Sequence, residues 1–208
     1  FVAFERVQKS YDGETLVVKD LNLSMPKGEF LTMLGPSGSG KTTCLMMLAG
    51  FETATHGEIM LDGVSINNIP PHKRGIGMVF QNYALFPHMT VAENLSFPLE
   101  VRKIGKADRE KKVKHALDMV QMGAFGGRRP AQLSGGQQQR IALARALVFE
   151  PELVLRKRLR RKLSDYVKNV PPHVQAARKA ESIRRQRNLP SMYESGGWIE
   201  YVMTVNGP

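Results

Sequence analysis

Short apolar segments separated by polar turns run through the first 80 residues. Their pattern predicts strands at residues 1–7, 16–25, 30–34, 57–61 and 77–80. Asp12-Gly13 is a typical hairpin turn between the first two segments, and residues 26–29 form a second turn. The beginning of the chain is therefore predicted to contain a β-rich part.

The pattern changes to helical spacing later in the chain. We predict helices at residues 42–49, with Gly50 as the C-cap, at 108–122 and at 135–148. In the second of these, Val113, Leu117 and Val120 recur at helical spacing. A short apolar strand is predicted at residues 153–155. Strands that alternate with helices predict an α/β domain with a largely parallel core sheet.

Composition narrows the class of protein. Hydrophobic residues make up 42% of the 208 residues, which is ordinary for a globular domain, and no stretch approaches the roughly 20 apolar residues that span a bilayer. The single cysteine, Cys44, cannot form an internal disulfide. Residues 156–208 carry 12 Lys/Arg and 4 Asp/Glu, so they contribute +8 of the net charge of +11. This asymmetry indicates a compositional boundary or a contact with nucleic acid or an acidic membrane.

A phosphate-binding loop is predicted where the strand at 30–34 meets the helix at 42–49. Residues 35–43, GPSGSGKTT, fit G-x-x-x-x-G-K-[ST]. Glycines let backbone N–H groups turn toward phosphate oxygens, and the following helix directs its positive dipole end at them. We expect Lys41 to reach the β- and γ-phosphates, Thr42 to bind Mg²⁺ and Thr43 to bind the α-phosphate. An ordinary glycine-rich turn is the alternative.

A second motif, LSGGQQQR at residues 133–140, identifies the family. Together with the first motif it resembles the signature of ABC-transporter ATPases. The resemblance implies a P-loop NTPase fold of the ABC ATPase type, with an antiparallel β subdomain, a parallel core sheet and a helical signature subdomain. It also implies that the helix start at Ser134 binds the γ-phosphate held by a second ATPase subunit. Taken alone, the motif would be an ordinary helix start with a Ser cap.

The resemblance implies further site residues. Gln81 is similar to the Q-loop glutamine, which contacts Mg²⁺ and the attacking water, and residues 83–90 are similar to the segment that receives a coupling helix from permease subunits. Tyr11 stands where the family has an aromatic ring that stacks on adenine. For Gln81 alone the alternative is a solvated loop residue, and for Tyr11 alone a core or rim position.

The expected ATP-binding residues are Tyr11, Gly35, Pro36, Ser37, Gly38, Ser39, Gly40, Lys41, Thr42, Thr43, Ser134, Gly135, Gly136 and Gln137. Thr42 and Gln81 are the expected Mg²⁺ ligands, and Gln81 is also the expected catalytic residue. The amino-acid sequences of residues 79–91 and 128–134 resemble those of ATPases from importers of the polyamine, iron and sugar group, most of all the spermidine/putrescine type. That implies a homodimer on the cytoplasmic face of the membrane, bound to permease subunits.

The family pattern stops at Leu155, before Walker B. In the family an apolar strand continues into Asp-Glu, and here it continues into Arg156-Lys157-Arg158. A cation at these positions would oppose Mg²⁺ and cannot act as a general base. We therefore expect residues 1–155 to form a partial nucleotide-binding domain whose hydrolysis is impaired.

Residues 156–208 are predicted to be a short α+β tail. Residues 156–166, 170–178 and 198–208 resemble the C-terminal region of bacterial family B DNA polymerases of the DNA polymerase II type. A helix is expected at 173–187 and a strand at 198–205, without a partner built for their apolar faces. We interpret the junction near residues 152–156 as a join of two fragments, by gene fusion or by a faulty sequence assembly; a divergent helical ending of the ATPase is the alternative.

Three functions follow from these observations. The chain is the ATP-binding subunit of an importer, a nucleotide-binding remnant that does not hydrolyse ATP, or a protein that binds nucleic acid weakly and without sequence preference through its basic tail. The presence of Walker B carboxylates would favour the first function, and their absence favours the second. Salt-dependent DNA binding separates the third.

Overall fold

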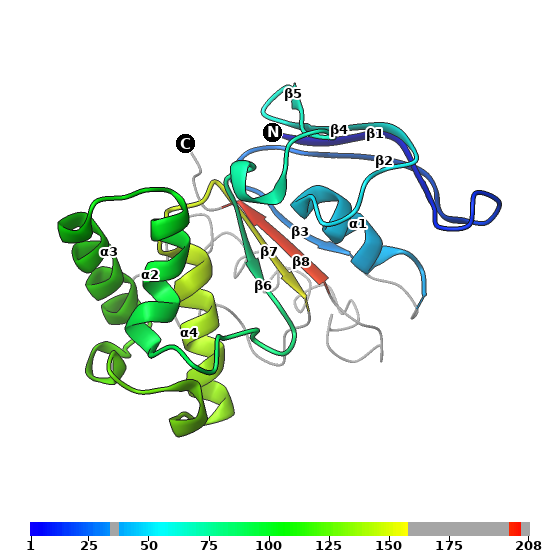
Figure 1. Ribbon diagram of the computed structural model, residues 1–208. Coiled ribbons are helices and arrows are strands. Elements are labelled where there is room, and N and C mark those ends of the chain that lie inside the picture. Colours follow the sequence, from blue (N-terminus) through cyan, green and yellow to red (C-terminus); the bar gives the residue numbers. More distant parts are fainter. Residues whose placement is uncertain (34–37, 158–199, 205–208) are drawn as a thin grey trace, which may run out of the picture.

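The computed structural model describes residues 1–33, 38–157 and 200–204 (Figure 1). The strands are β1 (Val2–Ser10), β2 (Leu16–Met25), β3 (Phe30–Met33), β4 (His56–Leu61), β5 (Val64–Ser65), β6 (Ile76–Val79), β7 (Leu153–Lys157) and β8 (Glu200–Thr204). The helices are α1 (Lys41–Ala49), α2 (Val91–Val101), α3 (Lys106–Met119) and α4 (Gly135–Leu147). Short 3₁₀ helices cover Pro71–Lys73, Gly123–Phe125 and Pro130–Gln132.

Two sheets organise the described residues. One is antiparallel, in the order β2-β1-β4-β5, and the hairpin predicted around Asp12-Gly13 joins its strands β1 and β2. The other, the core sheet, has the order β3-β8-β7-β6. Figure 1 shows α1 between the two sheets, with α2, α3 and α4 together on the other side of the core sheet.

The hydrophobic core explains this layering. Leu45 and Leu48 of α1 pack with Phe4 of β1 and with Leu155 of β7 in one cluster. Val154, whose side chain alternates to the opposite face of β7, packs with Leu143 of α4 in another. Because β7 is buried on both faces, its first three residues, 153–155, are all apolar instead of alternating with polar ones.

The core sheet is mixed, so the prediction of a largely parallel sheet needs correction. Strands β6 and β7 are parallel, whereas β8 runs antiparallel to both β3 and β7. The strand predicted at residues 198–205 is confirmed by β8. Its backbone is paired with β3 on one edge and with β7 on the other. The expectation that its apolar face has no partner built for it stays a prediction. The predicted helix at 173–187 lies outside the described residues.

Most predicted elements are confirmed with small shifts of their ends. The helix expected at 108–122 is α3, which ends at Met119, and Gly50 caps α1 in the left-handed conformation with φ 85°. The sequence analysis did not predict α2 or the two-residue strand β5. No helix among the described residues is long and apolar enough to cross a membrane.

Arg74 fixes the C-terminal end of α1. Its side chain is 6% exposed, and its guanidinium donates to the carbonyl oxygens of Met47 at 2.7 Å and Leu48 at 2.9 Å. It also donates to the oxygen of Ile69 at 2.6 Å, in the segment between β5 and β6. The last carbonyls of a helix have no partner within the helix, so a buried cation here satisfies them and interacts favourably with the helix dipole.

We expect Arg74→Met to lower the free energy of unfolding by about 3 kcal/mol, because it removes the hydrogen bonds of a buried guanidinium to the carbonyl groups of Met47, Leu48 and Ile69. Urea denaturation followed by circular dichroism measures this change. The matched control is Lys73→Met at the exposed neighbouring position, which should change the free energy by less than about 0.5 kcal/mol. Equal stability of the two variants would contradict this role for Arg74.

Candidate nucleotide site

The direction of the strands brings the first group of predicted site residues to one edge of the core sheet. Since β8 is antiparallel to β3 and to β7, and β7 is parallel to β6, the strands β3, β6 and β7 all point the same way. Residues 34–43 follow β3, and Gln81 follows β6. The crevice outside the carboxyl ends of such strands is where open α/β sheets bind ligands.

The described part of the phosphate-binding loop has the backbone that the motif requires. Gly38 and Gly40 have φ values of 84° and 80°, in the left-handed region that favours glycine. A Cβ on Gly40 would lie 2.9 Å from the carbonyl oxygen of Val17 in β2, so only glycine fits at this contact. Gly35, Pro36 and Ser37 lie outside the described residues.

Helix α1 begins at Lys41, as predicted, with Gly40 at its N-cap. The first N–H groups of a helix have no partner within the helix and form a natural anion site. The Lys41 ammonium donates to Ser39 Oγ at 2.9 Å, so it lies on the loop side of the helix start. The described loop residues thus provide N–H donors and one cation at a single point.

Gln81 is exposed and begins a strained loop. Tyr83 and Ala84 have φ values of 63° and 49°, which are unusual for residues other than glycine. Arg145 of α4 holds this pair: its Nη1 donates to Ala84 O at 2.8 Å and its Nη2 to Tyr83 O at 3.0 Å. The loop that carries Gln81 is therefore attached to the helix that begins at the LSGGQQQR motif.

Asn94 fixes the continuation of this loop. Its side chain is fully buried, accepts from Phe86 N–H at 2.8 Å and donates to the oxygens of Phe86, Met89 and Thr90. Thr90 caps α2 in a capping box with Glu93. The Thr90 N–H and hydroxyl donate to the Glu93 carboxylate and hold its pKa below the usual value.

The second predicted group of residues forms the start of α4. Ser134 is the N-cap, and its hydroxyl accepts from Gln137 N–H at 3.3 Å while its own N–H donates to the Gln137 side chain at 2.8 Å. Ser134, Gly135 and Gly136 are exposed. The predicted helix start is confirmed. A Cβ added at Gly135 or Gly136 would have no atom within 4 Å, so the space beside both glycines is open.

The two groups of residues do not meet within one chain. Helices α1 and α4 pack on opposite faces of the core sheet, and Figure 1 shows their N-terminal ends far apart. One molecule therefore does not bring the starts of α1 and α4 together. This arrangement is what the resemblance implies for a site shared between two subunits.

Tyr11 lies in the turn after β1, 59% exposed, with the Lys9 ammonium 4.7 Å from the centre of its ring. The turn itself is ordered by Asp12, whose carboxylate accepts N–H groups of Glu14 and Thr15. These bonds, led by the one from Thr15, lower the pKa of Asp12. An exposed aromatic ring on an ordered turn is able to stack on a planar ligand.

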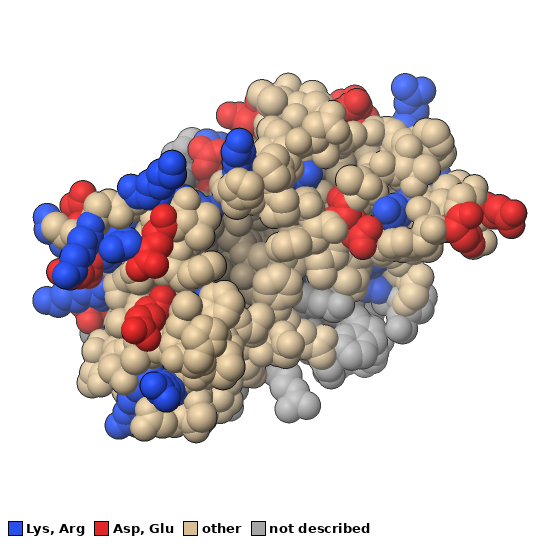
Figure 2. Space-filling model, viewed as in Figure 1, with Lys and Arg blue, Asp and Glu red and all other residues tan. Residues whose placement is uncertain are grey.

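A groove of about 550 Å³ between α2 and α3 contains none of the predicted site residues. Charged side chains line it, and Figure 2 shows them gathered over these helices while the centre of this face is mostly uncharged. Two of these side chains pair across the helices, Arg109 with Glu100 at 3.0 Å. Four carboxylates line it, those of Glu93, Glu100, Glu110 and Asp118, and they would repel a phosphate, so we do not assign the groove to the nucleotide.

Sequence comparison identifies the family. The family model described as ABC transporter matches residues 18–156, which includes both motifs. The chain belongs to the ABC transporter family.

Relatives within the ABC family are importer ATPases by name. The chain is 48% identical over 154 residues to the spermidine/putrescine import ATP-binding protein PotA of Bacillus cereus and 51% identical over 154 residues to PotA of Aggregatibacter actinomycetemcomitans. These alignments cover 74% of this chain and 47% and 41% of the relatives. The sn-glycerol-3-phosphate import ATP-binding protein UgpC of Bordetella avium is 39% identical over 201 residues, 96% of this chain and 54% of UgpC. The chain spans about half the length of the curated relatives it matches.

A solved ABC structure has the same fold. The ATP-binding cassette MJ0796, in a dimeric post-hydrolysis state bound to ADP and Pi, superposes with a TM-score of 0.69 at 30% sequence identity. The match covers 90% of this chain and 84% of that structure. The ABC ATPase fold expected from the sequence is confirmed. The UgpC alignment extends into residues after 156, and the polymerase resemblance of that segment stays a prediction.

Sequence reasoning missed three residues whose contacts fix segments near the predicted site residues: Lys9, Asn94 and Arg145. Lys9 and Arg145 contact carbonyl groups of residues far along the chain, and Asn94 contacts the backbone of an irregular loop. No residue pattern in the sequence predicts such contacts. The S/T-x-x-E pattern at residues 90–93 was the one local signal for the capping box and for α2.

We expect Arg145→Met to loosen the loop that carries Gln81, because the variant keeps the buried stem but loses two charge-assisted hydrogen bonds. Amide hydrogen exchange at residues 81–86 should accelerate by at least about tenfold, because the loss of even one such bond corresponds to about that factor. The control is Lys114→Met, at an exposed position of α3. Unchanged exchange at residues 81–86 in the Arg145 variant would show that the loop is held by other contacts.

Proposed function

We propose that this chain binds ATP through residues 35–43, with the adenine against Tyr11. The observation that carries the proposal is the position of the α1 N-terminus at the carboxyl edge of the core sheet, with the Lys41 ammonium on the loop side. Phosphates favour such a helix start because unpaired N–H groups and the helix dipole both attract negative charge. The ABC family match supports the same ligand.

We infer that the chain acts as the nucleotide-binding subunit of a solute importer on the cytoplasmic face of a membrane. The names of the PotA and UgpC relatives support this role. Polyamines are the proposed solute, because the PotA relatives are 48% and 51% identical to this chain and UgpC is 39% identical. The two relatives are named for different solutes, so the choice rests on identity alone.

The proposed partners are a second copy of the chain and permease subunits. Separation of Lys41 from Ser134 within one chain supports the second copy, whose exposed helix start at Ser134, Gly135 and Gly136 would complete the phosphate site. Residues 83–90 are the proposed permease contact. In this region Phe86 and Phe97 stack edge to face at 4.9 Å, and Phe97 is 38% exposed, which leaves apolar surface for a partner.

The residues present fit a Mg²⁺ ion that arrives with the nucleotide. Thr42 and Gln81 would hold it through a hydroxyl and an amide oxygen, which are the hard oxygen ligands that Mg²⁺ accepts beside phosphate oxygens and water. When bound, the ion would neutralise phosphate charge. Among the described residues no group of three or more His, Cys, Asp or Glu side chains could hold a metal ion.

We propose that hydrolysis by this chain is slow. The strand β7 ends in Arg156 and Lys157, and Arg158 follows in the sequence. Neither of the two positions after Arg156 carries a carboxylate that could orient Mg²⁺ or accept a proton from water. A nucleotide-binding protein with little turnover is therefore the form of the function that we favour for this chain. Weak, salt-dependent DNA binding by residues 156–208 remains the alternative that rests on charge alone.

Lys41→Ala should weaken ATP binding by about 10- to 100-fold, because a charge-assisted contact with phosphate contributes roughly 1.5–3 kcal/mol. Titration with fluorescently labelled ATP measures the affinity. Lys19→Ala, which removes an exposed lysine of β2, is the matched control and should bind ATP like the parent. Unchanged affinity in the Lys41 variant would refute the assignment of the phosphate site.

Phosphate release by the parent chain should be about 10²- to 10⁴-fold slower than by an intact PotA relative, since general-base catalysis contributes that much. Both proteins are assayed with saturating Mg-ATP after their ATP affinities have been measured. A rate equal to that of the relative would contradict the proposal of impaired hydrolysis and leave the proposal of ATP binding intact.

A further inference from the structure

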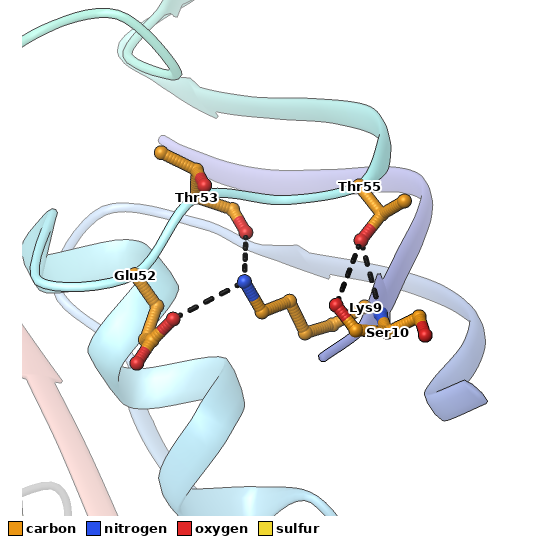
Figure 3. Close-up of polar contacts among 5 residues, drawn as sticks. All are labelled: Lys9, Ser10, Glu52, Thr53 and Thr55. Carbon is orange, nitrogen blue, oxygen red and sulfur yellow. Dashed lines mark hydrogen bonds and ion pairs between the residues drawn. The ribbon is translucent and has the colours of Figure 1, made fainter. Parts of the chain in front are cut away.

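Lys9 is a buried lysine that contacts the segment after α1 and the ring of Tyr11. It lies near the end of β1, two residues before Tyr11, and is 8% exposed. Its ammonium donates to Thr53 O at 2.9 Å and forms an ion pair with Glu52 Oε2 at 3.1 Å, as Figure 3 shows. The same ammonium lies 4.7 Å from the centre of the Tyr11 ring.

Glu52 and Thr53 belong to the segment that leaves α1. The N–H groups of Phe51 and Glu52 donate to Met46 O, so this segment is attached to the last turn of the helix. A second set of bonds ties it to β1: Thr55 N–H donates to Gln8 O at 2.8 Å, and Ser10 N–H donates to the Thr55 hydroxyl at 3.0 Å (Figure 3). The end of the phosphate-binding helix is thus attached to the strand that leads into Tyr11.

The Tyr11 ring has no other described ring or charge contact than the one with Lys9. A cation over the face of a tyrosine ring attracts it by about 0.5–1 kcal/mol at exposed sites and about 2 kcal/mol when it is shielded from water. Because Lys9 is buried and held by two other groups, its position is fixed, and the ring is drawn to that fixed point. One face of the ring is then directed at the ammonium, and a base would stack on the other face.

We propose that Lys9 is a positioning residue for nucleotide binding: it sets the Tyr11 ring at a fixed place relative to α1, so that one molecule can stack its base and bind its phosphates at the same time. This inference rests on the proposed function. Lys9 touches neither the base nor the phosphates. Its effect is confined to ligands that contact both Tyr11 and the start of α1. For such ligands, a ring that is already in place lowers the free-energy cost of binding the base and the phosphates together.

The test compares ATP with inorganic tripolyphosphate, which has the phosphates but no base. Each ligand displaces labelled ATP from the parent chain and from the variants Lys9→Met, Lys9→Arg and Tyr11→Leu. Lys9→Met should lower the affinity for ATP about tenfold and leave the affinity for tripolyphosphate within about twofold. Lys9→Arg should restore most of the ATP affinity, since its cation can lie over the ring and pair with Glu52.

A double variant separates positioning from a structural effect. In the Tyr11→Leu background, Lys9→Met should cause little further loss of ATP affinity, because the ring on which it acts is gone. Lys19→Met is the control for loss of a lysine, and a thermal melt of each variant records whether the fold is intact. The direct readout is the ratio of the affinity for ATP to the affinity for tripolyphosphate in each variant. A uniform loss of folded protein does not change this ratio.

The outcomes distinguish this inference from the proposal on which it rests. If the parent chain binds neither ligand, the proposed function fails. If the parent binds ATP and Lys9→Met binds it equally well, the role of Lys9 is overturned and the proposed function stands. A parallel fall in the affinities for ATP and tripolyphosphate also overturns it, since Lys9 would then act on the phosphate site or on the fold.

Discussion

The direction of three strands is the constraint on which the site depends. Because β3, β6 and β7 point the same way, the loop after β3 and Gln81 after β6 reach the same edge of the core sheet. Strand β8 makes this possible in the described residues, since it pairs with β3 on one side and β7 on the other. A reversal of β3 or of β6 would place Lys41 and Gln81 at opposite edges of the sheet.

A phosphate site needs more than a helix N-terminus; it needs a helix that does not move. Helix α1 is fixed at its start by the contact of Gly40 with the backbone of Val17, and at its end by Arg74. Its apolar face packs between the two sheets, and Lys9 attaches the segment after it to β1. These contacts come from four separate stretches of the chain, so the N–H groups are oriented before any ligand arrives and binding does not have to order them.

The sequence predicted those parts of the candidate site that depend only on residues close together in the chain. The glycines with positive φ, the start of α1 at Lys41 and the Ser134 cap of α4 each depend on a few neighbouring residues, and the sequence predicts them well. Helix α2 was missed because Pro98 lies inside it, although the capping box of Thr90 and Glu93 marks its start. The antiparallel direction of β8 depends on pairing between residues about 45 and 170 positions apart along the chain, such as Arg156 and Thr32 with Tyr201, and no periodicity carries that information.

The end of β7 bears on the proposal that this chain binds ATP but hydrolyses it slowly. Arg156 is 2% exposed, pairs in register with Val79 of β6 and shares a strand face with Val154, which packs in an apolar cluster against α4. Helix α1 packs on the opposite face of β7, through Leu153 and Leu155. Gly40 and Arg74 fix α1 through contacts with Val17, Met47 and Leu48, whereas Arg156 lies on the other face of β7. The proposal that this chain binds ATP therefore does not depend on the proposal that it hydrolyses ATP slowly.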